Sequence, residues 1–459
     1  MSSHGYRTPA LAAVAVAVVG VCAFLMYRNG VFERWFARDT ENAAEVGQLR
    51  QAPPAPPPTA ASAIGWPQFL GPTRNGRAPD GPFRTDWDKR RPEPVWTTPL
   101  GGGFSSVAVV GGKLYTQDRQ GDTERVVCLD AATGAPLWDH SYPASYAGIG
   151  FDAGPRATPT VDGNRVYAVG ATGPFVCLEV PPAPGQPPRV VWQHDLPREF
   201  NGNAPQWGYA CSPLLDGDRV IVQPGGRDGS VVAFDKATGE ARWAVGKNPA
   251  GYSSPVAATV HGVPLVFALT GDALLCLRSD GSQMGSYSWP TRFEGNVAAP
   301  VVLDDYVFVS AAYGMGCALL RIKADGDRVR LEPVYAKRNK ALRSHHSTPV
   351  VVGRHLYGFD GDADAARFIC FSLIDGAPVE GWDAAGVRNG KVIAVGGYLV
   401  VLTQTGDLIL VEATPEEYRP VATVPLGFGG QQNWSQPVLV DGRLYVRGPD
   451  KLICLDVRP

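Results

Sequence analysis

The stretch SQPVLVDGRLYV at residues 435–446 recurs along the chain and decides the fold. A closely similar stretch, ATPTVDGNRVYA, occupies residues 157–168. In both, a proline precedes a short apolar run, an Asp-Gly turn and a second apolar run, which is typical of two strands joined by a tight hairpin. Eight copies follow one another at intervals of 42 to 54 residues, which indicates a repeat architecture. The proline falls at Pro159, Pro213, Pro255, Pro300, Pro349 and Pro437, and two degenerate copies have Val107 and Val392 there.

Each copy is followed by a further apolar run, a turn and a last short strand that carries an aromatic residue. Seven copies are complete, whereas the eighth, at Pro437, has only 22 residues after it and lacks this last strand. The segment PVWTT at residues 94–98 is a last strand with no copy before it. We therefore predict an all-β, eight-bladed β-propeller of four-stranded antiparallel blades, whose ring is closed by the N-terminal strand and has no free sheet edge. The aromatic position holds Trp96, Trp138, Trp192, Trp243, Trp289, Tyr335 and Trp382, with Val421 in the remaining place.

The composition agrees with this fold and excludes two classes of protein. The chain has 459 residues, of which 44% are hydrophobic and 19% charged, so it is too apolar to be a disordered protein. Its formal net charge of −2 provides no positive field for phosphates, and we expect no nucleic-acid partner.

The first 62 residues differ from the rest of the chain. An uncharged apolar run extends from Ala10 to Tyr27, long enough for one membrane-spanning helix. We interpret residues 1–27 as an uncleaved signal-anchor, with a cleaved signal peptide as the alternative. Residues 28–62 end in a Pro- and Ala-rich stretch that is typical of an extended linker. The domain prediction is therefore anchor 1–27, linker 28–62 and propeller 63–459.

Two of the turns carry a specific motif. The segments DAATGAPLW at residues 130–138 and DKATGEARW at residues 235–243 resemble the Asp-x-x-Thr-Gly-x-x-x-Trp signature of pyrroloquinoline quinone (PQQ) type propeller repeats. The segment WPQFLGPTRNG at residues 66–76 is similar to an opening motif of exported bacterial PQQ-like propellers, with Leu70 where arginine is usual. The resemblance covers residues 63–459. It implies either a quinoprotein alcohol dehydrogenase or a non-catalytic relative such as the barrel-assembly lipoprotein of the outer membrane, because one propeller scaffold carries unrelated activities.

Five cysteines occupy the strand position that Ala233 fills in its own repeat. These residues are Cys128, Cys177, Cys276, Cys370 and Cys454. A position locked to the repeat predicts small, buried, reduced side chains rather than disulfides.

The candidate site lies at one mouth of the central channel, because the residues just before each copy enter the ring from the same face. The polar and aromatic side chains there suit a planar anionic ligand through arginine contacts and stacking on indole faces, and a solvated rim of loops is the alternative. The predicted binding residues are Arg156, Trp207, Tyr209, Tyr252, Glu294, Asn296, Arg343, His345, Arg388, Gln432 and Trp434.

A catalytic function or a metal site has less support in the sequence. The resemblance implies that a quinoprotein dehydrogenase carries an adjacent pair of cysteines, which this chain lacks, and calcium ligands, of which only Glu294 and Asn296 could be matched. The acidic stretch Asp360–Asp364 lacks the spacing of a calcium loop, so a solvated turn is the preferred interpretation. His345 and His346 are neighbours, which on a strand would point to opposite faces and could not share a metal.

We therefore predict a membrane-tethered, extracytoplasmic propeller that acts as a non-catalytic binding or scaffold module for envelope proteins or peptides. It is expected to be periplasmic or at the cell surface, monomeric, and without a metal or cofactor. One alternative is a PQQ-dependent oxidoreductase, with calcium, that acts on alcohols or sugars. The other is a carbohydrate-binding propeller with Trp207 and Trp434 as stacking platforms.

Overall fold

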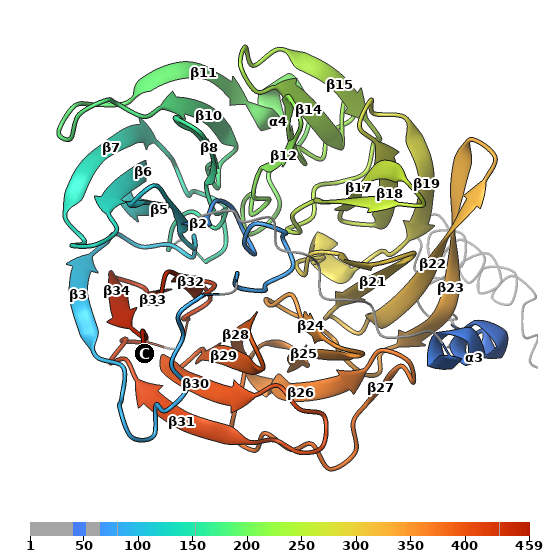
Figure 1. Cartoon of the computed structure of the whole chain (residues 1–459). Helices are drawn as coiled ribbons and strands as arrows, with labels where there is room; N and C mark the ends of the chain where they lie inside the picture. Colours follow the sequence, from blue (N-terminus) through green and yellow to red (C-terminus); the bar gives the residue numbers. More distant parts are fainter. Residues whose placement is uncertain (1–39, 52–64, 80, 152, 431) are drawn as a thin grey trace, which may run out of the picture. The chain divides into compact units, whose positions relative to one another are not determined.

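The computed structural model describes residues 40–51, 65–79, 81–151, 153–430 and 432–459. In these residues the strands form eight antiparallel sheets around a central axis, which confirms the predicted all-β, eight-bladed propeller (Figure 1). The anchor expected at residues 1–27 lies outside the described residues. Within the described ranges no helix has the length and apolar character needed to cross a bilayer.

We number the blades in chain order and give each from its inner strand outward. Blade 1 has β4 (Ala108–Val110), β5 (Lys113–Gln120), β6 (Thr123–Asp130) and β7 (Pro136–Pro143), with β2 (Gly65–Trp66) added beside β4. Blade 2 has β8 (Thr160–Asp162), β9 (Arg165–Val169), β10 (Pro174–Glu179) and β11 (Arg189–Asp195), and blade 3 has β12 (Leu214–Asp216), β13 (Arg219–Val222), β14 (Val231–Asp235) and β15 (Ala241–Val245). Blade 4 has β16 (Val256–Val260), β17 (Val263–Leu269), β18 (Ala273–Arg278) and β19 (Gln283–Ser288).

The remaining blades follow the same order, and two of them include strands from the N-terminal part of the chain. Blade 5 has β20 (Val301–Leu303), β21 (Tyr306–Ala311), β22 (Gly316–Asp325) and β23 (Arg328–Arg338), with β1 (Thr40–Glu41) added outside β23. Blade 6 has β24 (Val350–Val352), β25 (His355–Asp360), β26 (Arg367–Ser372) and β27 (Ala377–Pro378), and blade 7 has β28 (Gly390–Val395), β29 (Tyr398–Thr403), β30 (Asp407–Glu412) and β31 (Pro420–Pro425). Blade 8 has β32 (Val438–Val440), β33 (Arg443–Arg447), β34 (Lys451–Asp456) and β3 (Pro94–Pro99). The helices are α3 (Ala43–Gln51), α4 (Leu196–Glu199) and the 3₁₀ turns η1 (Arg292–Glu294) and η2 (Ala363–Ala365).

The strand that carries Trp96 pairs with the last strand of the chain, as the repeat arithmetic predicts. Trp96 of β3 lies opposite Cys454 of β34. Cys128 faces Trp138, Cys177 faces Trp192, and Ala233 faces Trp243 in the same way, each at a β-bulge. The cysteines and the aromatic residues therefore belong to one structural register. In the described residues none of the seven cysteines forms a disulfide and all are buried, which agrees with the prediction of reduced core thiols for the five in the repeat position.

Five of the seven aromatic side chains donate a hydrogen bond to a carbonyl of the following blade. Trp192 of blade 2 lies against the Thr-Gly turn of blade 3 and donates its indole N–H to the Lys236 carbonyl at 3.4 Å. The same contact joins blades 8 and 1, 3 and 4, 5 and 6, and 6 and 7, through Trp96 to Ala131, Trp243 to Ser279, Tyr335 to Leu373, and Trp382 to Thr414. The Thr-Gly turn and the aromatic residue of the repeat signature thus form an interlock between neighbouring blades.

Three positions depart from the expected aromatic ladder. In blade 4 the register places Gly285 opposite Cys276, and Trp289 lies four residues further on, beyond the end of β19. A side chain at Gly285 would collide with the Val329 carbonyl of the long β22–β23 hairpin, so that hairpin occupies the aromatic position. In blade 7 the matching residue is Ala422 rather than Val421, which is the bulge residue. Trp382 lies outside the short strand β27, although it still makes the contact with the next blade.

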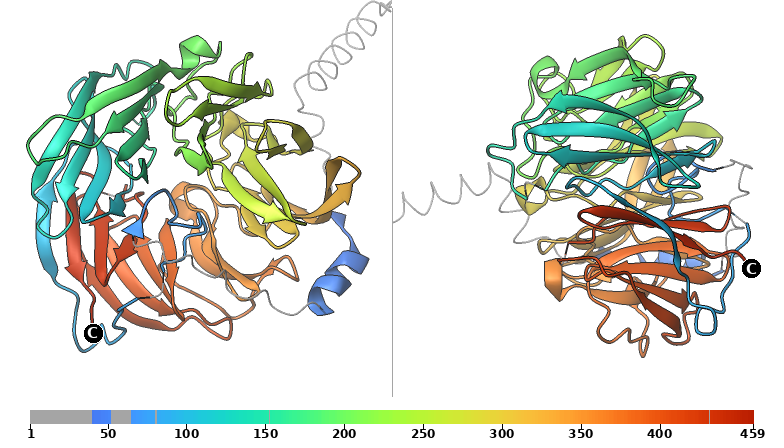
Figure 2. Two further views of the ribbon diagram at one scale, coloured as in Figure 1. Left: turned by 45° about the horizontal axis from the view of Figure 1, so that its top comes forward. Right: turned by 90° about the vertical axis from the view of Figure 1, so that its left-hand side faces the viewer.

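The segment that contains WPQFLGP crosses the centre of the ring and contacts all eight blades. We call residues 65–79 and 81–84 the central segment, which Figure 2 shows inside the ring. Its contacts begin with β2 on β4 of blade 1 and end with the Arg84 N–H on the Val457 carbonyl of blade 8. The buried guanidinium of Arg74 donates to the carbonyls of Ser212 and Pro213 in blade 3. Hydrogen bonds connect Pro67 to Val161 of blade 2, Arg77 to Val351 of blade 6, and Ala78 to Ala394 of blade 7. Leu70 makes apolar contacts with Val256 of blade 4 and with Ala299, just before blade 5.

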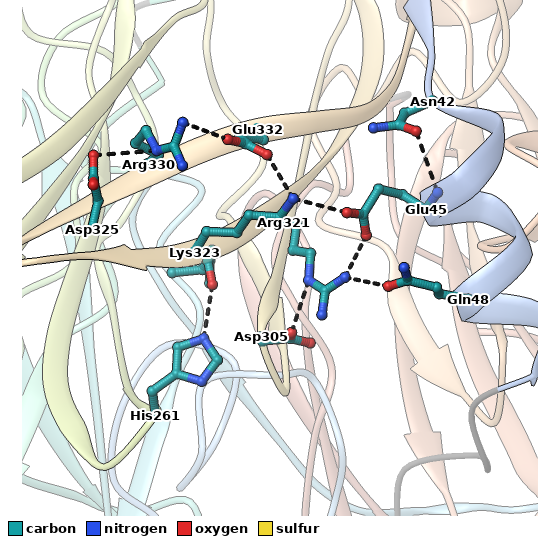
Figure 3. A network of polar contacts seen from close by, with 11 residues as sticks. Asn42, Glu45, Gln48, His261, Asp305, Arg321, Lys323, Asp325, Arg330 and Glu332 are labelled. Atoms are coloured by element: carbon teal, nitrogen blue, oxygen red, sulfur yellow. Dashed lines mark hydrogen bonds and ion pairs between the residues drawn. The ribbon is translucent and has the colours of Figure 1, made fainter.

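Residues 40–51 are folded onto blade 5, which departs from the expectation of an extended linker over 28–62. Strand β1 pairs with β23, and Val46 of α3 is buried in the core between blades 5 and 6. The Glu45 carboxylate lies within 2.5 Å of Arg321 and 2.9 Å of Lys323 on β22 (Figure 3). These cations hold the pKa of Glu45 below its usual range although burial opposes that shift. Only the Pro-rich end of the segment has linker composition, which explains the difference.

The interlock predicts unequal costs for two glycine substitutions. Gly163 and Gly239 both have positive φ, but a Cβ at Gly163 meets open space, whereas one at Gly239 would lie 2.6 Å from the Trp192 ring. We expect Gly163→Ala to lower the free energy of unfolding by about 1 kcal/mol through backbone strain. Gly239→Ala should cost about 1–3 kcal/mol more through overpacking. Urea denaturation of the two variants measures the difference, and equal costs would contradict the interlock.

Candidate functional site

A cavity of about 500 Å³ opens at the centre of the ring, and residues preceding the inner strands form most of its wall. The predicted convergence of these segments is therefore present. The lining consists of Phe69, Phe104, Ser106, Phe151, Arg156, Thr158, Trp207, Ala210, Ser212, Tyr252, Ser254, Val297, Tyr313, His345, His346, Thr348, Ala363, Asp364, Lys391, Gln432, Trp434 and Gln436. Six of the eleven predicted binding residues belong to it: Arg156, Trp207, Tyr252, His345, Gln432 and Trp434.

The aromatic residues of the lining form a continuous arc. One half is centred on Trp207, whose ring lies 5.4 Å from Tyr252 and 6.0 Å from Tyr313. The other half is centred on Trp434, whose ring lies 4.9 Å from Phe104 and 4.3 Å from His346. His345 joins the halves, since it contacts both Tyr313 and His346. The cavity therefore offers a largely aromatic wall to a ligand.

Two phenylalanines stand exposed beside this arc. Phe151 is 52% exposed and lies 5.8 Å from Trp434, and Phe293 is 37% exposed and lies 5.8 Å from Trp207. Both have positive φ, 54° and 63°, a conformation that costs energy in a bulky residue. A strained backbone thus presents an apolar side chain on each half of the arc.

The two histidines lie side by side rather than on opposite faces, so that expectation is wrong. They occupy a bend before β24, not a strand, and their rings stack with centroids 3.8 Å apart. Nδ1 of His345 accepts the Ala363 N–H at 2.7 Å, so neutral His345 carries its proton on Nε2 and donates to the Tyr313 hydroxyl at 2.8 Å. Burial lowers the pKa of His345 to about 4 and that of His346 well below its usual range. Both rings are neutral at pH 7.

Lys391 on β28 was not among the predicted binding residues. Its side chain lines the cavity, and Nζ donates to the His346 carbonyl. Burial lowers its pKa to about 7, so a large fraction of the amine is neutral near that pH. The signal in the sequence was a single cation, Lys391, in the apolar run GKVIAV at residues 390–395. Tyr313 and Phe104 were missed because they lie in irregular segments.

Five of the predicted residues lie outside the cavity lining. The Tyr209 hydroxyl donates to the Pro224 carbonyl, and the Asn296 amide donates to the carbonyls of Thr270 and Trp289, so both support the fold. Arg343 forms an ion pair with Asp360 at 3.0 Å. The exposed residues among them are Glu294 and Arg388.

The three arginines among the predicted binding residues, Arg156, Arg343 and Arg388, are not gathered at the cavity. Only Arg156 lines the cavity, and its guanidinium donates to the carbonyls of Gly150, Phe151 and Gly154. Because these carbonyls accept hydrogen bonds from both terminal nitrogens, the Arg156 guanidinium is poorly placed to form a bidentate hydrogen bond with an anion.

The residues offer a poor set of ligands for a metal or for a calcium-bound quinone. In the described ranges no three His, Cys, Asp or Glu side chains are grouped to hold an ion. Glu294, a calcium ligand in the quinoprotein alternative, lies outside the lining, and the Asn296 amide is turned to the backbone. In the acidic stretch, Asp362 accepts from the Tyr313 N–H and Asp364 from Gln404. These carboxylates are engaged by protein donors.

The eight blades, the Thr-Gly turns and the aromatic interlock define a propeller of PQQ-like repeats. The family described as outer membrane protein assembly factor BamB matches residues 84–181 and 185–382, and the chain belongs to this family. No curated protein matches the chain.

Two solved structures, BamB from Moraxella catarrhalis and the designed Ika8 protein, support the fold. BamB from Moraxella catarrhalis has a TM-score of 0.55 at 14% identity, covering 80% of this chain and 97% of that one. The computationally designed Ika8 protein has a TM-score of 0.51 at 12% identity, covering 78% and 98%. A europium-containing methanol dehydrogenase has a TM-score of 0.48 at 11% identity, covering 90% and 100%. At these identities the likeness concerns architecture alone.

The buried side chain of His345 predicts that the stability of the fold depends on pH. Its pKa of about 4 in the folded state lies below the value of about 6.5 expected after unfolding, so the unfolded chain binds the extra proton between these values. Stability is therefore lost as pH falls from about 7 towards 4. In His345→Gln we expect this loss to be smaller by up to about 1.4 kcal/mol per pH unit. Urea denaturation between pH 5 and 8 measures the free energy of unfolding of wild type and variant. An equal dependence of this free energy on pH in both proteins would contradict the lowered pKa of His345.

Proposed function

We propose that the chain is an extracytoplasmic binding module that holds an apolar segment of an envelope protein or peptide at the cavity mouth. The observation that carries the proposal is the pair of exposed phenylalanines, Phe151 and Phe293, on the two halves of the aromatic arc. Exposed apolar side chains next to a concave aromatic wall are typical of sites for partner side chains. Membership of the BamB family supports an envelope protein as the partner.

The same proposal includes the location of the chain. An anchor at residues 1–27 would tether the propeller to a membrane, supported by the uncharged run from Ala10 to Tyr27. The pairing of β3 with β34 supports a closed, monomeric ring.

The alternatives have weaker support. A PQQ-dependent oxidoreductase would need calcium ligands at the cavity, where Glu294 and Asn296 do not lie, so we propose that no quinone cofactor is used. A saccharide would need a free indole face, yet Trp207 packs with Tyr252, Phe293 and Tyr313. Saturable quenching by PQQ and calcium, with turnover of alcohols or sugars, would replace the proposal.

Site-specific photocrosslinking tests the proposal in the producing cells. A benzophenone amino acid is placed at Phe151 or Phe293, and at Val95 or Val190 as controls, because these four residues are the exposed large hydrophobic side chains of the described chain. We expect adducts with the same polypeptide at both mouth positions and not at the controls.

Two further variants connect the adducts to the cavity. Trp207→Ala and Trp434→Ala remove the centres of the arc, and each should reduce adduct yield at least severalfold while the circular dichroism spectrum is retained. Adducts at the controls alone, or yields unchanged by both variants, would place the partner site elsewhere on the ring.

A further inference from the structure

The cavity contains one amine whose charge has no partner in the described residues. Lys391 projects from β28 into the lining, is half-buried, and its recorded hydrogen bond is to the His346 carbonyl. No carboxylate within the described ranges forms an ion pair with it. The other lining cation, Arg156, donates to three backbone carbonyls. A buried ammonium without a counter-charge is costly, so an anion that enters the cavity would be stabilised at Lys391.

A second donor lies on the same side of the cavity. Nε1 of Trp434 and Nδ1 of His346 are buried without a hydrogen-bond partner among the described residues. The two rings are in contact, with centroids 4.3 Å apart, and the carbonyl of the same His346 receives the Lys391 ammonium. Buried donors of this kind normally have an acceptor. The Trp434 indole N–H, which can only donate, thus requires an oxygen acceptor at one end of the aromatic wall, and His346 Nδ1 can donate or accept according to its tautomer.

We propose that the cavity binds a carboxylate attached to an apolar or aromatic group, with Lys391 Nζ and Trp434 Nε1 donating to its oxygens. The apolar group packs on the aromatic arc. The carboxylate belongs either to a free organic acid or to the C-terminus of a peptide, which share this chemistry. The inference rests on the proposed function, in which a partner segment enters this mouth.

Binding of such a ligand is coupled to proton uptake. Because burial lowers the pKa of Lys391 to about 7, most of the amine is neutral at pH 8, and a bound carboxylate favours the charged form. The other groups that face the cavity are His345, His346, Asp364, Arg156, Tyr252 and Tyr313. The lowered pKa values of the histidines and the raised pKa values of the tyrosines keep these four side chains neutral between pH 7 and 9. Asp364 accepts from Gln404.

Isothermal titration of the full chain with 3-phenylpropionate tests the proposal, with 3-phenylpropionamide as the uncharged control. Titrations at pH 8 in two buffers of different ionisation enthalpy count the protons. We expect the acid to bind with uptake approaching one proton, and the amide to bind at least tenfold more weakly. Affinity for the acid should fall towards tenfold per pH unit above pH 8, because Lys391 must be protonated first.

Variants of Lys391 test the contribution of its amine to binding separately from that of the other lining residues. Lys391→Met should weaken binding of the acid at least tenfold, whereas Lys391→Arg should retain binding without proton uptake, since arginine is always charged. Lys236→Met, which removes a lysine paired with Asp162 on the outside of the ring, should change neither. Equal binding of acid and amide, or binding of the acid without proton uptake at pH 8, would overturn the proposal even if a Lys391 variant fails to fold.

A peptide that ends in phenylalanine distinguishes the two sources of the carboxylate. Tighter binding of the free-carboxylate peptide than of 3-phenylpropionate indicates a chain terminus, and binding of the small acid alone indicates a free organic acid. Photocrosslinking at Phe151 and Phe293 in Lys391→Met distinguishes the two levels of inference. Adducts that persist while the wild-type chain fails to bind the acid would retain the proposed function and reject carboxylate recognition.

Discussion

The propeller depends on the contact between the aromatic residue of one blade and the turn of the next. Each blade is a small sheet that buries both faces, so its stability requires neighbours on both sides. The middle strands show this directly, since Phe175, Cys177 and Leu178 of β10 are all fully buried. The interlock aligns neighbouring sheets by a specific hydrogen bond as well as by packing, as between Trp192 and the Lys236 carbonyl. Where the next blade has a different turn, the bond is lost: the Trp138 indole N–H has no partner among the described residues, and blade 2 continues into a Pro-rich loop after β10.

The central segment adds a second constraint along the axis. It makes hydrogen bonds or apolar contacts with every blade, and Arg74 alone satisfies two carbonyls that precede the inner strand of blade 3. Burial lowers the pKa of Arg74 to about 10, yet the guanidinium stays charged at neutral pH. Phe69 of the same segment belongs to the cavity lining. The segment therefore couples the assembly of the ring to the shape of the site.

The site results from the way in which the blades converge. Segments from all eight blades contribute side chains to the wall, so no single repeat contains the site. The aromatic side chains around the cavity also lower the pKa values of the basic groups among them. They remove water from His345, His346 and Lys391 and favour the neutral form of each. Rigid blades and strained loops, as at Phe151 and Phe293, hold these groups in place.

The architecture could be predicted from the sequence because the repeats recur at a regular spacing. The proline before each inner strand, as at Pro159 and Pro437, located six of the eight blades, and Trp96 identified the strand that joins the last blade. The aromatic ladder was less reliable: at Gly285 a long hairpin from the next blade fills the aromatic place, and the length of a neighbouring hairpin cannot be read from the repeat itself. Residues 40–51 were missed because their docking depends on Arg321 and Lys323, nearly 280 residues away.

The sequence by itself determined the number of blades, the strand order within each blade and the face at which the loops meet. It also named Trp207, His345 and Trp434, because they precede inner strands. Only the tertiary structure decided which side chains turn inward. Arg343 is drawn away by Asp360, Asn296 by backbone carbonyls, and Lys391 is directed into the cavity from within a strand. The reason is that strand periodicity is a local property, whereas the direction and charge state of a loop side chain depend on partners from other blades.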